Sequence, residues 1–164
     1  MADERPTATV DPIDQVLAEQ ALLDLRSFAR LRVVGASLWL GIGAFGLLLV
    51  EPMLTASIPW IAGYLSIAVL VNTGYRRSER FARVTWPFLA PLIDLPATFF
   101  ILRAELPFAT DLQTAALATF AISVFVVFIV PAPAGRGWGQ IAVNASVACA
   151  LGYRLFWEAG ILIP

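Results

Sequence analysis

The chain has 164 residues, of which 59% are hydrophobic and only 14% are charged. A soluble domain carries about 25% charged residues. The apolar residues here gather in runs of roughly 17–20, the length that crosses about 30 Å of hydrocarbon as a helix. The composition therefore excludes an ordinary soluble domain and indicates a membrane protein.

All basic residues are arginines, because the sequence contains neither lysine nor histidine. Without histidine, a bis-histidyl haem, a histidine metal site and a histidine proton relay are excluded. Without lysine, a retinal Schiff base is excluded. The lone Cys149 excludes an internal disulfide and a cysteine metal cluster. We expect no catalytic, cofactor-binding or metal-binding residue in this chain and no nucleic-acid partner.

Residues 1–12 are predicted to be a disordered tail, which lacks the features of a cleavable signal peptide. Asp11 and Pro12 are typical of a helix start. Residues 13–32 are predicted to form an amphipathic cytoplasmic helix. Its apolar residues fall at helical spacing: Ile13, Leu17, Ala21, Leu25 and Phe28. This helix either lies on the membrane surface or is a solvated lead-in to the first span.

The fold class predicted for residues 33–164 is an all-α, polytopic transmembrane helix bundle. The five expected spans are Val33–Val50, Ser57–Thr73, Val84–Leu102, Leu112–Val130 and Trp138–Trp157. Turns rich in proline, glycine or charge separate them: Glu51–Pro52, Gly74–Arg83, Arg103–Asp111 and Pro131–Gly135. Ile161–Pro164 resembles the first residues of a sixth span, which we expect to be truncated here.

Arginine bias predicts the orientation. The turn between the second and third spans carries Arg76, Arg77, Arg80 and Arg83, and Arg26, Arg30 and Arg32 precede the first span. By the positive-inside rule these arginines face the cytoplasm. We therefore expect a multi-pass protein of the bacterial inner membrane with a cytoplasmic N-terminus. Trp39 is expected to be a packing residue within the first span.

Asp94 is the candidate functional residue within the membrane. An acid at the centre of a span costs about 2.5–3.5 kcal/mol, so its side chain should face protein or trapped water. Pro91 and Pro96 flank it and each removes one helical amide, which frees the carbonyls of Pro87 and Leu92. A protonated Asp94 can donate to one of these carbonyls.

Two interpretations of Asp94 stay open. In the first, the proline-rich helix is kinked and bistable and responds to a ligand or to proton uptake. In the second, Asp94 is a buried acid that only holds the bundle together, through Asn144 on the fifth span. Arg154 is expected to reach outward to the headgroups. Small residues at four-residue spacing on the fifth span, Ala142, Ser146 and Ala150, favour close helix packing within or between chains.

Three segments give the chain a resemblance to a known family: Arg30–Gly35 entering the first span, the arginine-rich turn Arg76–Arg83, and Pro91–Pro96 followed by Phe99 and Phe100. Together they resemble the N-terminal membrane domain of bacterial class III adenylate cyclases, over about residues 26–157. The resemblance implies six spans, a homodimer, and a cytoplasmic catalytic domain that converts ATP to cAMP. That catalytic domain lies outside this chain.

The expected function is therefore that of membrane anchor, dimerisation and sensor domain of such a cyclase. The expected partners are the lipid bilayer, a second copy of the chain, and a small lipophilic or periplasmic ligand. Two alternatives remain: a free-standing small membrane subunit of a larger complex, and the anchor of a sensor histidine kinase. A proton-coupled carrier is a third class, which would depend on Asp94.

Overall fold

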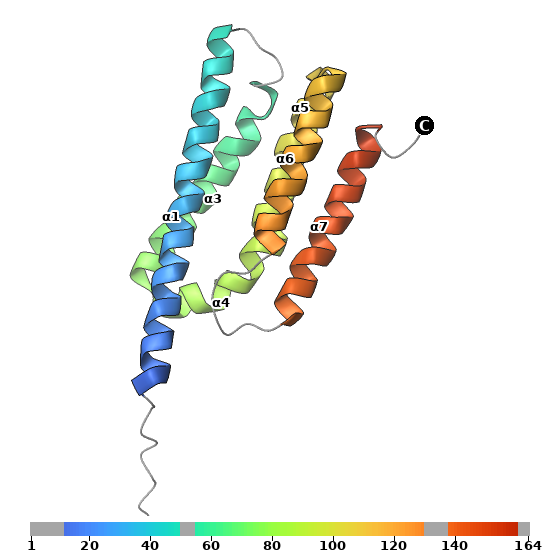
Figure 1. Cartoon of the computed structure of the whole chain (residues 1–164). Helices are drawn as coiled ribbons and strands as arrows, with labels where there is room; N and C mark the ends of the chain where they lie inside the picture. Colours follow the sequence, from blue (N-terminus) through green and yellow to red (C-terminus); the bar gives the residue numbers. More distant parts are fainter. Residues whose placement is uncertain (1–11, 50–54, 130–137, 161–164) are drawn as a thin grey trace, which may run out of the picture.

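The computed structural model describes residues 12–49, 55–129 and 138–160, and within these ranges the regular structure is entirely helical. In chain order the elements are α1 (Pro12–Leu49), α3 (Ile58–Arg77), α4 (Glu79–Leu89), η1 (Ala90–Asp94), α5 (Leu95–Glu105), η2 (Leu106–Phe108), α6 (Asp111–Ile129) and α7 (Trp138–Glu158). Figure 1 shows them as elongated helices side by side. The all-helical prediction is confirmed for this part of the chain.

Helix α1 joins two segments that the sequence had separated. The predicted amphipathic helix and first span form one helix of 38 residues, which at 1.5 Å per residue is about 57 Å long. Figure 1 shows it running without a break. Nothing interrupts the helix at the Arg32–Val33 boundary, since neither proline nor glycine occurs there. Its N-terminal half is therefore a rigid continuation of the first span.

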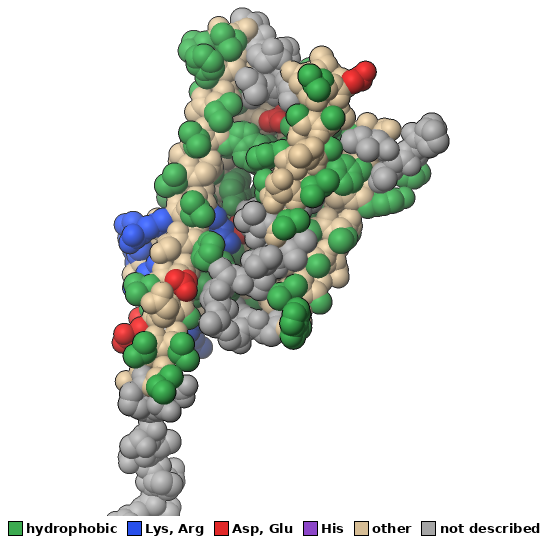
Figure 2. All heavy atoms as spheres, in the orientation of Figure 1, with side chains coloured by type: hydrophobic (Ala, Val, Ile, Leu, Met, Phe, Trp, Pro, Cys, Tyr) green, Lys and Arg blue, Asp and Glu red, His purple; other side chains and the backbone are tan. Residues whose placement is uncertain are grey.

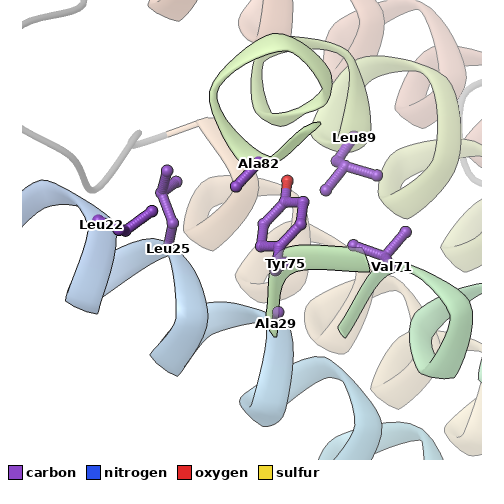
Figure 3. Packing of buried hydrophobic residues seen from close by; sticks show 7 residues of the cluster. All are labelled: Leu22, Leu25, Ala29, Val71, Tyr75, Ala82 and Leu89. Atoms are coloured by element: carbon purple, nitrogen blue, oxygen red, sulfur yellow. The ribbon is translucent and has the colours of Figure 1, made fainter. Parts of the chain in front are cut away.

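A buried cluster joins the N-terminal half of α1 to α3 and α4. It consists of Leu22, Leu25, Ala29, Val71, Tyr75, Ala82 and Leu89. Figure 3 shows the Tyr75 ring at its centre. Tyr75 is 0% exposed, and the Arg26 Nε donates to its carbonyl at 3.3 Å. Protein thus covers part of the apolar face predicted for residues 13–32, whereas Ile13 and Leu17 remain exposed.

The connection between α3 and α4 is much shorter than expected. We predicted a turn over Gly74–Arg83, but α3 continues to Arg77 and α4 begins at Glu79. Ser78 makes the bend in an extended conformation, and its hydroxyl accepts a hydrogen bond from the Phe81 amide. Gly74 lies within α3, where a Cβ atom would approach the Phe81 ring to 2.5 Å. The glycine therefore permits a close helix approach and does not start a loop.

The predicted third span, Val84–Leu102, lies inside a longer helical segment, Glu79–Phe108. Its middle turn, Ala90–Asp94, is a π-helix, in which the Leu95 amide donates to the Ala90 carbonyl five residues earlier. Proline removes helical amides and favours such irregular turns. Figure 1 shows the chain changing direction between α4 and α5. The sequence-predicted kink is thus located at this π turn.

The last two helices lie close to their predicted ranges, α6 at Asp111–Ile129 and α7 at Trp138–Glu158. Trp39 of α1 packs edge-on against Phe120 of α6, with ring centroids 5.3 Å apart, which agrees with its predicted packing role. The predicted turn Pro131–Gly135 and the predicted start of a sixth span at Ile161 lie outside the described residues, as does Glu51–Pro52.

Helix α3 runs opposite to α5, whereas α5 and α7 end at the same end of the bundle. Ser57 before α3 contacts Glu105 at the end of α5, and Arg103 contacts Glu158 at the end of α7. The Tyr75 cluster marks the other end of α3.

Three of the described helical segments are long and apolar enough to cross a membrane: Gln15–Leu49, Ile58–Arg77 and Glu79–Phe108. A shorter apolar helix covers Asp111–Val124. Large apolar side chains are exposed along the outer faces of these helices, including Leu38, Phe45, Leu48, Leu70, Leu92 and Ile122. Figure 2 shows apolar side chains scattered over the upper part of α1 and over its neighbours.

Replacing Tyr75 with alanine is expected to lower the free energy of unfolding by about 3–5 kcal/mol, because a large buried side chain leaves a cavity. The measurement is denaturant unfolding of the chain in detergent micelles. Tyr153→Ala is the matched control, since Tyr153 is 60% exposed and its loss should cost less than about 1 kcal/mol. Equal losses in the two variants would contradict the packing described here.

Candidate functional site

The Asp94 carboxylate forms an ion pair with Arg32 of α1. The Arg32 Nε lies 3.0 Å and 2.9 Å from the two carboxylate oxygens, and the Nη2 donates to Oδ2 at 2.7 Å. The side chains are 9% and 0% exposed for Arg32 and Asp94 respectively. This fork geometry is the strong form of an arginine–carboxylate contact. The pair therefore joins α1 to the last residue of the π turn.

Two aromatic side chains complete the surroundings of this pair. The Tyr64 hydroxyl of α3 donates to Oδ1 of Asp94 at 2.8 Å. The Trp86 ring of α4 lies 5.0 Å from the Arg32 Cζ, a cation–π distance. Arg32, Tyr64, Trp86 and Asp94, which we call the charge cluster, thus come from four separate helical elements. Hydrogen bonds from charged and neutral donors to Asp94 suit an ionised carboxylate.

One hydrogen-bond donor of the charge cluster has no acceptor among the described residues. The Arg32 Nη1 is buried and has no hydrogen-bond partner among the described residues. A buried donor without a partner costs about 1–3 kcal/mol, and more when it is charged. This arrangement of the pair is consequently less stable than one in which Nη1 also finds an acceptor.

One of the two carbonyls freed by the prolines accepts a hydrogen bond from another helix. Pro91 is buried in the π turn and Pro96 lies in the first turn of α5. The Gln140 Nε2 of α7 donates to the Pro87 carbonyl at 2.8 Å, one of the two acceptors we had expected for Asp94. The same Nε2 lies 2.9 Å from Oδ1 of the buried Asn144.

Asn144 of α7 lies near the kinked helix that carries Asp94. Helix α7 contacts the π turn, and the hydrogen bonds given above attach its Gln140–Asn144 pair to the backbone at Pro87. The charge cluster contacts the same helix from α1 and α3. The structure thus brings Asp94, Pro91 and Asn144 into one region, with the arginine–tyrosine contacts as the partners of the acid.

The predicted orientation arginines lie apart from the charge cluster. Arg76, Arg77, Arg80 and Arg83 are all exposed, at the end of α3 and the start of α4. Arg154 is exposed too, and it donates to Glu158 one turn later, which agrees with its expected outward direction. At the same end of the bundle the Ser57 hydroxyl donates to the buried Glu105 carboxylate at 2.6 Å.

Sequence reasoning missed Arg32 and Tyr64 as partners of Asp94. Arg32 was counted among the arginines that set the orientation, because it directly precedes an apolar run. The available signal was the acid itself, since a carboxylate within a span pairs with a base or with backbone groups. Tyr64 gave no signal, because a tyrosine in an apolar run is ordinary there.

The charge cluster can rearrange hydrogen bonds and charge, but it lacks the groups of a hydrolytic or metal centre. Among the described residues, no three histidine, cysteine or acidic side chains lie close enough together to hold a metal ion. Comparisons of the chain with family models, with curated proteins and with solved structures found no match. The function therefore has to be argued from the site.

Arg32→Gln is expected to lower the free energy of unfolding by about 3–5 kcal/mol, because it leaves the buried Asp94 without its counter-charge. The double variant Arg32→Gln/Asp94→Asn should recover a large part of this loss. Unfolding in micelles measures both. Arg30→Gln is the matched control and should have almost no effect, since Arg30 is exposed. Additive losses in the double variant would show that the two side chains are not paired.

Gln140→Leu is expected to leave the Pro87 carbonyl unsatisfied and to destabilise the π turn by about 1–3 kcal/mol. Hydrogen exchange of the backbone amides over residues 88–95 should become faster. Ser146→Ala serves as the control on the same helix, because the Ser146 hydroxyl donates only to the Ala142 carbonyl of its own helix. Unchanged exchange in Gln140→Leu would refute the role given to Gln140.

Proposed function

We propose that the chain is a five-span helix bundle of the bacterial inner membrane and the anchor, dimerisation and sensor domain of a class III adenylate cyclase. The single observation that carries this proposal is the buried Arg32–Asp94 pair, seated on a π turn in a bundle with an apolar exterior. The proposal takes the charge cluster as the part that changes state. The catalytic domain would follow on the cytoplasmic side, after the sixth span that the sequence pattern predicts.

Membrane insertion is supported by the distribution of polarity. Arg32, Asp94, Glu105 and Asn144 face the interior, whereas large aliphatic and aromatic side chains cover much of the outside. Soluble proteins show the reverse, because charged groups are rarely buried and large exposed apolar surfaces signal contact with another apolar phase. In a bilayer this arrangement places apolar surface against lipid and matches each buried charge inside the protein.

The proposed orientation puts the Arg76–Arg83 turn and the N-terminal half of α1 in the cytoplasm. It rests on the exposure of these arginines together at one end of the helices. Helix α1 then extends beyond the membrane, because its length of about 57 Å exceeds the roughly 30 Å of the hydrocarbon layer. The exposed Leu17 of this extension is available to a second copy of the chain in a homodimer.

A sensor role is supported by the way α1 joins the two regions. The same continuous helix carries Leu22 and Leu25, which belong to the Tyr75 cluster, and Arg32, which belongs to the charge cluster. A ligand or proton that separates Arg32 from Asp94 would release α1 from the π turn. The movement would reach the cytoplasmic end of α1 because a continuous helix transmits displacement along its axis. The buried Arg32 Nη1 lacks an acceptor among the described residues, which favours a second arrangement of the charge cluster in which this donor is paired.

The cyclase assignment is supported by the sequence resemblance of three segments. Two of them contain residues of the charge cluster: Arg30–Gly35 includes the ion-paired Arg32, and Pro91–Pro96 includes Asp94 and most of the π turn. The third, Arg76–Arg83, contains the exposed arginines. The same architecture would also suit the anchor of a sensor histidine kinase or a free-standing subunit, and the test below separates these.

The test joins the chain, through one added transmembrane span, to a class III catalytic domain in a bacterium that lacks its own cyclase, so that the catalytic domain lies in the cytoplasm. The expected result is cAMP formation that Asp94→Asn changes at least severalfold, with membrane insertion intact. Arg30→Gln is the control and should leave cAMP output unchanged. Equal output from Asp94→Asn and the unaltered chain would refute the sensor role. A stop codon directly after Pro164 in the gene would refute the cyclase assignment and favour the free-standing subunit.

A further inference from the structure

Three exposed arginines, Arg76, Arg77 and Arg80, surround the Ser78 bend between α3 and α4, and we call them the arginine turn. None of the three makes a hydrogen bond or ion pair within the part of the chain that the structure describes. Glu79 is the one acidic residue in this stretch of sequence. Figure 2 shows basic side chains gathered on one flank of the molecule beside α1.

Four arginines elsewhere in the described part of the chain have partners within the protein, unlike those of the arginine turn. Arg26 donates to the Tyr75 carbonyl and Arg32 to Asp94, whereas Arg103 and Arg154 both donate to Glu158. The arginine turn thus presents a concentrated positive charge that the described residues leave uncompensated. Such a charge attracts an anion from outside the chain.

The position of the arginine turn indicates which class of anion it would bind. It follows directly on an exposed apolar face of α3 that includes Val69 and Leu70, and it precedes exposed Phe81 and Val84 of α4. Apolar surface and unpaired positive charge therefore meet at this bend. An anionic phospholipid presents the same pair of features, acyl chains next to a phosphate.

The local geometry suits a phosphate group. Arginine binds phosphate oxygens through two parallel N–H donors. Helix α4 begins at the bend, so the positive end of its dipole lies among the arginines. We infer that the arginine turn binds the phosphate headgroup of an anionic phospholipid in the cytoplasmic leaflet. This inference rests on the membrane placement proposed above and goes beyond it by naming a lipid ligand.

The experiment measures the affinity of the full chain, in zwitterionic micelles, for short-chain phosphatidylglycerol and for phosphatidylcholine. The expected result is a preference for phosphatidylglycerol that weakens as salt is added. The triple variant Arg76→Gln/Arg77→Gln/Arg80→Gln should lose this preference, with affinity falling roughly 100-fold at low ionic strength. Arg154→Gln, at the opposite end of the bundle, is the control and should bind like the unaltered chain.

Folding of the triple variant is not expected to limit the test, because the three side chains form no hydrogen bond or ion pair with the described residues. Its unfolding midpoint should equal that of the unaltered chain, and the micelle makes insertion orientation irrelevant. Equal affinity for the two lipids, or a preference that persists in the triple variant, would overturn the lipid site. Competition by inorganic phosphate at the same concentration would assign the site to free phosphate and also overturn it. Incorporation into zwitterionic vesicles without any lipid preference would reject this inference alone and leave the membrane placement standing.

Discussion

The ion pair between Arg32 and Asp94 is the interaction on which the arrangement of the helices depends. An isolated charge in an apolar interior costs several kcal/mol, so each of these side chains requires the other. Meeting this requirement fixes α1 against the middle of the proline-rich helix. The Tyr64 hydroxyl of α3 donates a hydrogen bond to the same carboxylate, so α3 is held there as well. A single buried acid thus sets the mutual position of three helical elements.

The π turn links the ion pair to helices on both sides of the bundle. Prolines leave the backbone around Ala90–Asp94 with fewer internal hydrogen bonds, and Gln140 of α7 satisfies one of the freed carbonyls. Helices α1 and α3 therefore hold one side of the turn and α7 holds the other. A change at the ion pair has a direct path to both sides, and α1 extends from the ion pair to the Tyr75 cluster. This is the physical basis of the proposed sensor role.

Arginine serves distinct purposes along the chain, according to its surroundings. Arg32 neutralises a buried acid, Arg26 binds the carbonyl at the end of α3, and the arginine turn stays exposed. The sequence alone does not separate these uses, because all three lie near the ends of apolar runs. Burial distinguishes them: an arginine next to a buried carboxylate pairs with it, while one at an exposed helix bend remains available to an external anion.

Local sequence was sufficient to predict the helical class, the approximate ranges of the helices and the burial of Asp94, since apolar run length, proline and charge act over a few residues. Tertiary structure decided the rest. It showed α1 to be one helix, reduced the Gly74–Arg83 turn to the bend at Ser78, and chose Arg32 and Tyr64 as the partners of Asp94. These partners lie 62 and 30 residues away. Which distant side chain meets a buried acid depends on how the helices pack, and short-range sequence patterns do not encode that packing.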